Sequence, residues 1–330
     1  MFLRAHLLKE SKAIEYCRAN GISLERDMSG TSNATGGVLV PVEMENSIID
    51  LRVEYGVFRS NARVVPMMSD TKNQPRRTGG LTAYAVGPGQ AGTESTPSYD
   101  LIELVARKWM VLADYEAEFG EDAIISAADT LASEIAYAFT YAEDNAGFNG
   151  TGLSATHGIV GLIAKLTAAT AGLQTASGNA WSEIVEADIL GVIGKLPQFA
   201  RKSGNVKWYC SHTFWATVLQ RIALAKGGVT LAEVQGKMME VAFGYPVEIV
   251  EVMPTTEANS QIPLLFGNLS QASTMGDRRG VTISTADQHA SNWAADIMTV
   301  KGTERFDINV HDVGDTTNAG AIVGLITASS

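Results

Sequence analysis

Apolar side chains recur at three- and four-residue steps over residues 119–149, and this stretch carries the strongest helix signal in the chain. The stripe consists of Ile124, Ala127, Leu131, Ile135, Ala138 and Ala142. Such spacing places apolar side chains on one face of an α-helix, and Gly147, Gly150 and Gly152 mark its end. A helix over this range would span about 45 Å at the standard rise per residue. The pattern does not sustain heptads, so it predicts a structural spine rather than a coiled coil.

Shorter patterns of both periods occupy the rest of the chain. Helices are predicted over residues 3–19, 42–55, 184–196 and 212–225, and strands over residues 206–211, 247–253, 263–269, 275–284, 294–310 and 320–328. Residues 25–37 are small and polar, which is typical of a flexible arm. Helices and strands mixed in this way predict an α+β architecture, with a sheet order that the pattern does not reveal.

The segment at residues 66–108 has neither period and carries four of the nine prolines and five glycines. Lys72, Arg76 and Arg77 are expected at its tip, followed by a polar run at residues 93–98. This composition predicts a long, irregular hairpin that projects from a globular body. Compact domains seldom carry such a segment without a function, and it cannot bury enough apolar surface to hold itself in place. We therefore expect it to lie on a neighbouring molecule, which favours assembly over catalysis.

The charges along the chain are divided between two segments. Nine acids and no lysine or arginine lie between Lys108 and Lys165, namely Asp114, Glu116, Glu118, Glu121, Asp122, Asp129, Glu134, Glu143 and Asp144. The hairpin and its approach are basic instead, with Arg59, Arg63, Lys72, Arg76 and Arg77. Any one of these residues alone is best explained by a solvated face, but the two segments together favour complementarity between subunits. The pattern predicts inter-subunit contacts, each worth about 0–1 kcal/mol if exposed, at Lys72, Arg76, Arg77, Glu118, Glu121 and Asp122.

Composition sets limits on the class of protein. A chain of 330 residues with 45 % apolar and 18 % charged residues has room for about two folded, water-soluble domains. The net charge of −11 disfavours a protein that grips nucleic acid, although not one that encloses it. No run of eighteen apolar residues occurs, so no membrane-spanning helix is expected. Residues 1–6 lack the pattern of a secretory signal.

Sequence patterns of known catalytic and metal sites are absent. Residues 152–156 lack the second glycine of a nucleophile elbow, and neither a phosphate-binding loop nor a zinc motif occurs. Asp114, Glu116 and Glu118 alternate as on a strand, where a solvated edge is favoured over a Ca²⁺ or Mg²⁺ site. The sequence therefore predicts no catalytic residue, no metal and no cofactor.

The two cysteines do not change this interpretation. Cys17 and Cys210 are best explained as buried or half-buried thiols in a reducing compartment. A thiol–imidazole pair of Cys210 with His212 is a minor alternative, because His212 is expected to begin a helix.

Several local motifs, in their order along the chain, resemble one known family. The motifs are Gly36–Pro41, Val57–Pro66, Thr82–Tyr84, Gly92–Ser95, Ala142–Ala146, Asn149–Gly152, Gly244–Val247, Leu265–Leu269 and Asp277–Val281. Together with the long hairpin and the spine helix, they resemble the Hong Kong 97-type major capsid proteins of tailed bacteriophages. The resemblance covers about residues 36–310.

The resemblance implies a division of the chain into named parts. It comprises an N-terminal arm (1–40), the start of a peripheral domain (41–65), an extension loop (66–108), the peripheral domain with the spine helix (109–159), an axial domain (160–290) and the return strands of the peripheral domain (291–330). The implied function is self-assembly, as pentamers and hexamers, into an icosahedral head shell around double-stranded DNA. The implied partners are further copies of the chain, a portal, and scaffolding or decoration proteins, with no membrane and no sequence-specific contact to DNA. The implied location is the virion, after assembly in the host cytoplasm.

Two departures from the family and two alternatives accompany this interpretation. Many members carry a longer scaffold-like segment before the Gly36-Gly37 junction than the 35 residues found here. Lys72 lies in the loop through which the founding member cross-links its subunits, but the other two residues of that reaction are not identified, so covalent cross-linking is not expected. The alternatives are an encapsulin-like shell around protein cargo and a soluble α/β enzyme with an unrecognised site. Enclosed DNA would exclude the first, and sedimentation at megadalton mass would exclude the second.

Overall fold

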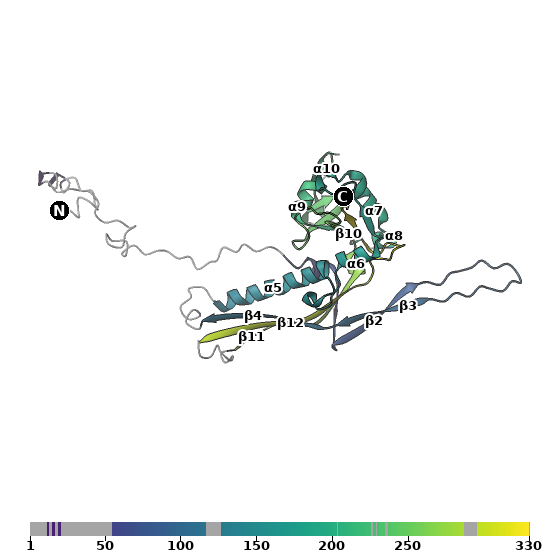
Figure 1. Cartoon of the computed structure of the whole chain (residues 1–330), viewed down its shortest axis with the longest axis horizontal. Coiled ribbons are helices and arrows are strands. Elements are labelled where there is room, and N and C mark those ends of the chain that lie inside the picture. Colours follow the sequence, from purple (N-terminus) through teal and green to yellow (C-terminus); the bar gives the residue numbers. More distant parts are fainter. Residues whose placement is uncertain are drawn as a thin grey trace. The chain divides into compact units, whose positions relative to one another are not determined.

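The computed structural model describes residues 55–116, 127–202, 204–225, 227–228, 230–234, 237–286 and 296–329, together with residues 12, 15, 16, 19 and 20. The chain divides into two compact units, residues 1–50 and 51–330. In the first unit, Lys12, Glu15, Tyr16 and Ala19 are helical, within the helix predicted over residues 3–19. The predicted arm and the Gly36–Pro41 junction lie outside the described residues. The account below concerns the second unit (Figure 1).

One half of the second unit is a four-stranded sheet with a long helix on one face. Strand β1 (Arg63–Pro66) pairs in parallel with β11 (Ser273–Ala286), and β11 pairs antiparallel with β12 (Ile297–Val310). The far edge is β4 (Arg107–Glu116), which is antiparallel to β12. Helix α5 (Ala127–Asn149) runs along this sheet (Figure 1).

The alternating burial of side chains along β4 explains why α5 lies on one face of the four-stranded sheet. Every second side chain of β4 is half-buried and the others are exposed, as expected of a strand with one covered face. The apolar cluster between helix and sheet contains Ile135, Phe139 and Val300, with Trp109, Val111, Tyr115 and Leu131 packed against it. Part of the predicted stripe thus packs on the sheet, and the spine helix is confirmed over 127–149. The rest of its predicted range, 119–126, lies outside the described residues.

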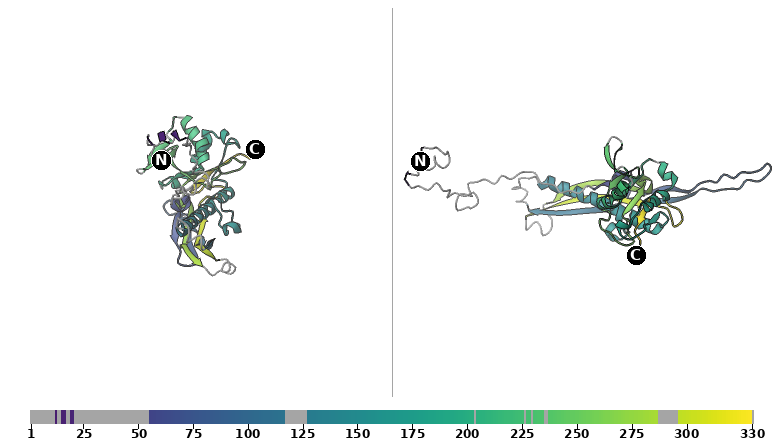
Figure 2. Two further views of the ribbon diagram at one scale, coloured as in Figure 1. Left: turned by 90° about the vertical axis from the view of Figure 1, so that its left-hand side faces the viewer. Right: turned by 90° about the horizontal axis from the view of Figure 1, so that it is seen from above.

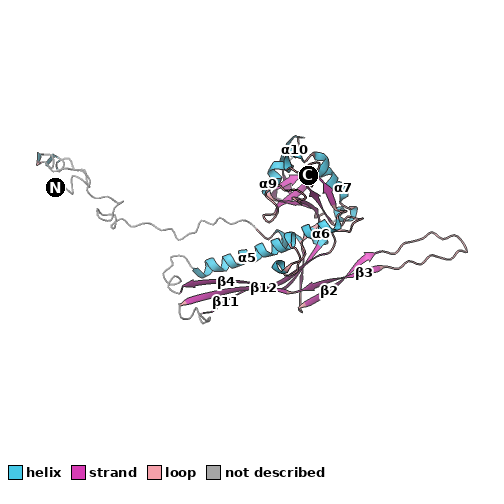
Figure 3. Cartoon of the chain, viewed as in Figure 1, coloured by secondary structure: helices cyan, strands magenta, loops and turns pink. Residues whose placement is uncertain are grey.

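The other half of the unit is a seven-stranded mixed sheet covered by helices (Figure 3). Its strands, in spatial order, are β5 (Leu173–Thr175), β13 (Ile322–Ile326), β10 (Leu264–Gly267), β6 (Lys207–Cys210), β9 (Tyr245–Ile249), β8 (Lys237–Ala242) and β7 (Leu231–Val234). The helices are α6 (Leu162–Ala169), α7 (Glu186–Lys195), α8 (Gln198–Lys202), α9 (His212–Phe214), the π-helical η5 (Trp215–Leu219), α10 (Gln220–Ala225) and α11 (Leu269–Ala272). The largest apolar cluster includes the buried Trp208, Phe214 and Phe266.

Most predicted elements are found, but strand pairing divides them differently from the expected ranges. Strand β11 falls within residues 160–290, yet it pairs in the four-stranded sheet. Strand β13 falls within residues 291–330, yet it pairs with β10 and β5 in the seven-stranded sheet. The chain passes from the seven-stranded to the four-stranded sheet at α11, between β10 and β11, and returns to the seven-stranded sheet between β12 and β13. The hairpin of β7 and β8 was not predicted.

One glycine sets how closely α5 approaches its neighbours. A Cβ atom on Gly147 would lie 2.5 Å from Cε2 and 2.6 Å from Cγ of Phe58. Phe58 is fully buried and packs edge-on against Phe148, with 5.4 Å between the ring centroids. A side chain larger than a hydrogen atom at residue 147 would therefore force this buried ring to shift.

We expect Gly147→Ala to destabilise the chain by about 1–2 kcal/mol, because overpacking outweighs the gain in helix propensity. The matched control is Gly194→Ala in α7, where a Cβ atom would meet nothing within 4 Å. That variant should be neutral or stabilised by at most about 1 kcal/mol. Denaturant unfolding of both variants measures the difference, and equal stabilities would contradict the packing described here.

Candidate functional site

The segment at residues 66–108 forms an antiparallel ribbon with an unpaired end. We call β2 (Thr71–Gly79) and β3 (Ser98–Val105) the ribbon, and residues 80–97 the tip. The ribbon pairs from Thr71 opposite Val105 to Gly79 opposite Ser98, and no strand is assigned in the tip. The ribbon and tip extend beyond the two sheets in Figure 1 and in the right-hand view of Figure 2. The predicted projecting hairpin is confirmed, although it is more regular than expected.

The three cations expected at the end of the hairpin lie elsewhere. Lys72, Arg76 and Arg77 are all within β2, and Lys72 is only one residue from its start. Lys72 donates its ammonium to the carbonyl oxygen of Pro66 at 2.8 Å, and Arg77 donates Nε to that of Gly79 at 3.2 Å. Their expected place at the tip is therefore wrong, because regular pairing continues to Gly79.

A row of alternate residues on β12 holds the ribbon. We call Arg305, Asp307, Asn309 and His311, which directly follows the strand, the anchoring row. They make the following contacts with the ribbon and its flanking residues: Arg305 Nη2 to the Ala106 carbonyl at 3.3 Å and to Asp70 Oδ1 at 3.2 Å, Asp307 Oδ2 from the Val105 amide at 2.7 Å, Asn309 Nδ2 to the Glu103 carbonyl at 2.9 Å, and the His311 carbonyl from the Arg76 guanidinium. Alternate residues of a strand share one face. The anchoring row thus binds the first half of the ribbon and its flanking residues, through backbone groups at residues 103, 105 and 106 and through the side chains of Asp70 and Arg76.

Burial shifts the pKa values of Asp307 and His311 in this row. Burial raises the pKa of Asp307, while hydrogen bonds from the Val105 and Ile308 amides oppose the shift. Burial and the nearby Arg76 and Arg63 lower the pKa of His311 to about 4. The imidazole is therefore neutral at pH 7, and its Nε2 lies 3.0 Å from Oγ1 of Thr274.

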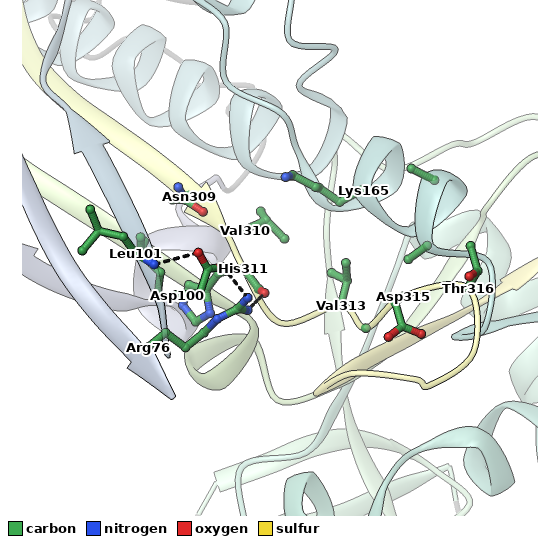
Figure 4. Close-up of a pocket in the computed structure, with 14 residues that line it drawn as sticks. Arg76, Asp100, Leu101, Lys165, Asn309, Val310, His311, Val313, Asp315 and Thr316 are labelled. Carbon is green, nitrogen blue, oxygen red and sulfur yellow. Dashed lines mark hydrogen bonds and ion pairs between the residues drawn. The ribbon is translucent and has the colours of Figure 1, made fainter. Parts of the chain in front are cut away.

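An open cleft borders the ribbon beside the anchoring row (Figure 4). It has a volume of about 520 Å³ and is lined by both signs of charge, including Arg76, Lys165, Asp100 and Asp315. Arg76 pairs with Asp100 at 3.1 Å. The described ranges contain no group of three or more His, Cys, Asp or Glu side chains placed to hold a metal ion.

The tip presents apolar side chains to solvent. Leu81, Tyr84 and Val86 are exposed by 65 %, 50 % and 46 %. Glu94 is the only charged residue of the tip. These exposed apolar side chains on a projecting segment make the tip a candidate binding surface for another protein.

A second charged group joins α3 (Val57–Asn61) to α5 and the four-stranded sheet. We call Arg59, Glu143, Asp277 and Glu304 the Arg59 cluster. The guanidinium donates to both oxygens of Glu143, with Nε 2.9 Å from Oε2, to Asp277 at 2.9 Å and to Glu304 at 3.1 Å. The hydrogen bond that Arg59 donates to Glu143 raises the pKa of Arg59 further above its ordinary value.

Two of the acids on the spine helix are therefore used within the chain. Glu143 binds Arg59, and Asp144 accepts hydrogen bonds from the first amides of α3, at 2.8 Å from Gly56, 3.2 Å from Val57 and 2.9 Å from Phe58. Burial raises the pKa of Asp144, and these three bonds oppose the shift. Arg59 and Glu143 are thus paired within one chain, which corrects their inclusion among charges free for a neighbour.

The remaining candidate residues add no reactive group. Asp114 on β4 accepts a hydrogen bond from Oγ1 of Thr299 at 2.6 Å. Glu118, Glu121 and Asp122 lie outside the described residues. Cys210 is a free, fully buried thiol, and burial raises its pKa, so it is held in the unreactive protonated form.

Known proteins match the chain in family and in fold. A model of the phage capsid family matches residues 36–314. No curated protein matches the sequence, and no described helix has the length and apolarity needed to cross a membrane.

Solved structures cover 91 % of the chain. One is the capsid of an empty GTA particle, computed with C5 symmetry, at 19 % identity over 99 % of that chain with a TM-score of 0.66. Others come from Microbacterium phage Oxtober96, at 16 % identity over 100 % of that chain with a TM-score of 0.67, and from Mycobacterium phage Bobi, at 14 % over 99 % with 0.65. At these identities the matches show a shared α+β fold, whereas the family follows from the sequence match. The chain therefore belongs to the phage capsid family and is a structural subunit of a virion shell.

Proposed function

We propose that the chain builds the icosahedral head shell around double-stranded DNA by placing its ribbon and tip on a second copy of itself. One observation carries the proposal: the anchoring row fixes the first half of the ribbon, whereas the tip projects with Leu81, Tyr84 and Val86 exposed. A single chain thus presents a positioned contact segment, and the described part of the chain offers no partner surface for it.

The occupant of the tip is argued from energetics. Two strands alone are marginally stable in water, and complete burial of a side chain such as leucine or valine contributes about 1.5–3 kcal/mol. A tip that binds a different surface on the next copy makes a head-to-tail contact, which closes into rings when the rotation closes. This is the kind of contact that pentamers and hexamers require.

The two halves of the second unit take different places in this proposal. The four-stranded sheet with α5 forms the peripheral domain, and the seven-stranded sheet with its helices forms the axial domain around the five- and six-fold axes. Strand β11 accordingly moves to the first domain and β13 to the second. The partners are further copies, a portal, and scaffolding or decoration proteins, and the enclosed DNA is not bound by sequence.

Charge complementarity is proposed to orient the copies rather than to hold them together. The contacts pair Lys72, Arg76 and Arg77 with Glu118, Glu121 and Asp122 of the next copy. Each exposed pair contributes about 0–1 kcal/mol. Arg77 is the best probe. Among the described residues its guanidinium binds only the Gly79 carbonyl of its own ribbon, whereas Arg76 binds Asp100 and the His311 carbonyl.

The tip is tested by Leu81→Ser combined with Tyr84→Ser. We expect the unassembled chain to keep its stability within about 0.5 kcal/mol, since both side chains are exposed. Shell formation should fall at least tenfold, because each copy loses apolar contacts with the next. Thermal unfolding measures the first quantity, and analytical sedimentation with electron microscopy measures the second.

The matched control for the tip is Leu153→Ser combined with Leu224→Ser. These leucines are exposed by 67 % and 57 % but lie outside the ribbon and tip. The control should assemble as the unchanged chain does. If the tip variant and the control gave equal yields of megadalton particles, the proposed role of the tip would be refuted.

Charge reversal at Arg77→Glu tests the orienting role. The yield of shells should fall several-fold at low salt and recover partly at high salt, because ions screen exposed charges. Arg201→Glu, on the exposed face of α8, is a control of the same size and charge. Light scattering during assembly at two salt concentrations provides the measurement, and identical salt responses of the two variants would count against the contact.

A further inference from the structure

The Arg59 cluster contains three acids and one base at a site that is largely shielded from water. One guanidinium faces the carboxyl groups of Glu143, Asp277 and Glu304, whose side chains are exposed by 4 %, 26 % and 3 %. Both Glu143 and Glu304 contact the same nitrogen, Nη2 of Arg59. Two carboxylates that share one site with little water cannot both ionise freely.

The charged side chains that face Glu304 come from three elements. Helix α3 contributes Arg59, α5 contributes Glu143, and β11 contributes Asp277. On β4 the residue opposite Glu304 is Trp109, which has no charge. If all three acids were ionised, the cluster would carry two uncompensated negative charges.

The second oxygen of Glu304 adds an independent reason for a proton. Oε2 is buried and accepts no hydrogen bond within the described part of the chain. Burying an ionised carboxylate with an oxygen that accepts no hydrogen bond costs free energy. A protonated carboxyl avoids that cost, because it can donate to the neighbouring carboxylate of Glu143.

We propose that Glu304 and Glu143 hold one proton between them, and that this proton is a clamp that joins β12 to α5 and α3. When the proton leaves to water or to a buffer base, two carboxylates face each other across Arg59, and the clamp weakens. Helix α3 leads directly into β1 and the ribbon, and the amide of Met67 donates to the Asp277 carbonyl at 2.8 Å. The clamp therefore lies where the chain enters the ribbon, and the anchoring row binds residues 103–106, where the chain leaves it.

The direction of the pH effect follows from burial. Burial and the charge of Glu143 raise the pKa of Glu304 from 4.5 to about 8. Between these values the folded chain holds a proton that the unfolded chain releases, so stability is lost as the pH rises. One such proton increases the equilibrium constant for unfolding by up to about tenfold per pH unit, and the increase stops above the folded pKa.

The test is Glu304→Gln, which keeps the size of the side chain and removes its titration. Denaturant unfolding of the full chain is measured from pH 5 to pH 9 for the unchanged chain and the variant. The unfolding constant of the unchanged chain, divided by that of the variant, should rise by up to about tenfold per pH unit and become constant above pH 8. A ratio that stays the same across this range would overturn the proposal.

A control and a second measurement keep the result decisive. Glu248→Gln removes an acid that pairs with Lys207 in the other sheet, and it should follow the pH dependence of the unchanged chain. If Glu304→Gln does not fold, infrared spectroscopy of the unchanged chain decides the matter. A protonated carboxyl band that disappears near pH 8 supports the clamp, and its absence at pH 7 refutes it.

Discussion

The backbone of a two-stranded ribbon must be held by something outside the ribbon, and in this chain one face of β12 does so. Asp307 and Asn309 bind the β3 backbone, Arg305 binds Asp70 and the Ala106 carbonyl, and the His311 carbonyl receives Arg76. These contacts end before residues 80–97. These contacts therefore fix the direction in which the ribbon leaves the sheet, and the tip is left for the proposed contact with another copy.

The same strand connects the ribbon with the body of the fold. On its other face, β12 carries Glu304 and Val300, which meet Arg59 and the spine helix. A change in the packing of α5 on β12 would thus reach the anchoring row through one strand. In the proposed shell, this connection would give a route by which one subunit adapts its ribbon to pentamers and hexamers.

Elements with a clear period could be predicted from the sequence alone. Leu131 and Ile135 belong to a regular stripe, and α5 packs through them. The hairpin was predicted from its prolines and glycines, but its regularity was not. Pro75 sits in β2 opposite Leu101, where a two-stranded ribbon leaves one edge unpaired and so tolerates a residue without an amide proton. The cations of β2 were consequently placed too far along the hairpin.

Contacts between distant residues could not be predicted. Arg59 and Glu143 are 84 residues apart, and Asp307 lies 202 residues from the Val105 amide that it accepts. Composition indicated a basic segment and an acidic one, whereas only the fold shows which charges are used within the chain. The pairing of β13 with β10 was hidden for the same reason, because an apolar run does not specify the sheet it joins.

Hydrogen exchange along residues 71–105, compared between the unassembled chain and assembled particles, tests the central claim most directly. The account predicts slow exchange at the β3 amides paired with β2 in both states, and fast exchange in the tip that becomes slow only after assembly. A tip that is already protected in the unassembled chain, or that stays unprotected in the particle, would contradict the account.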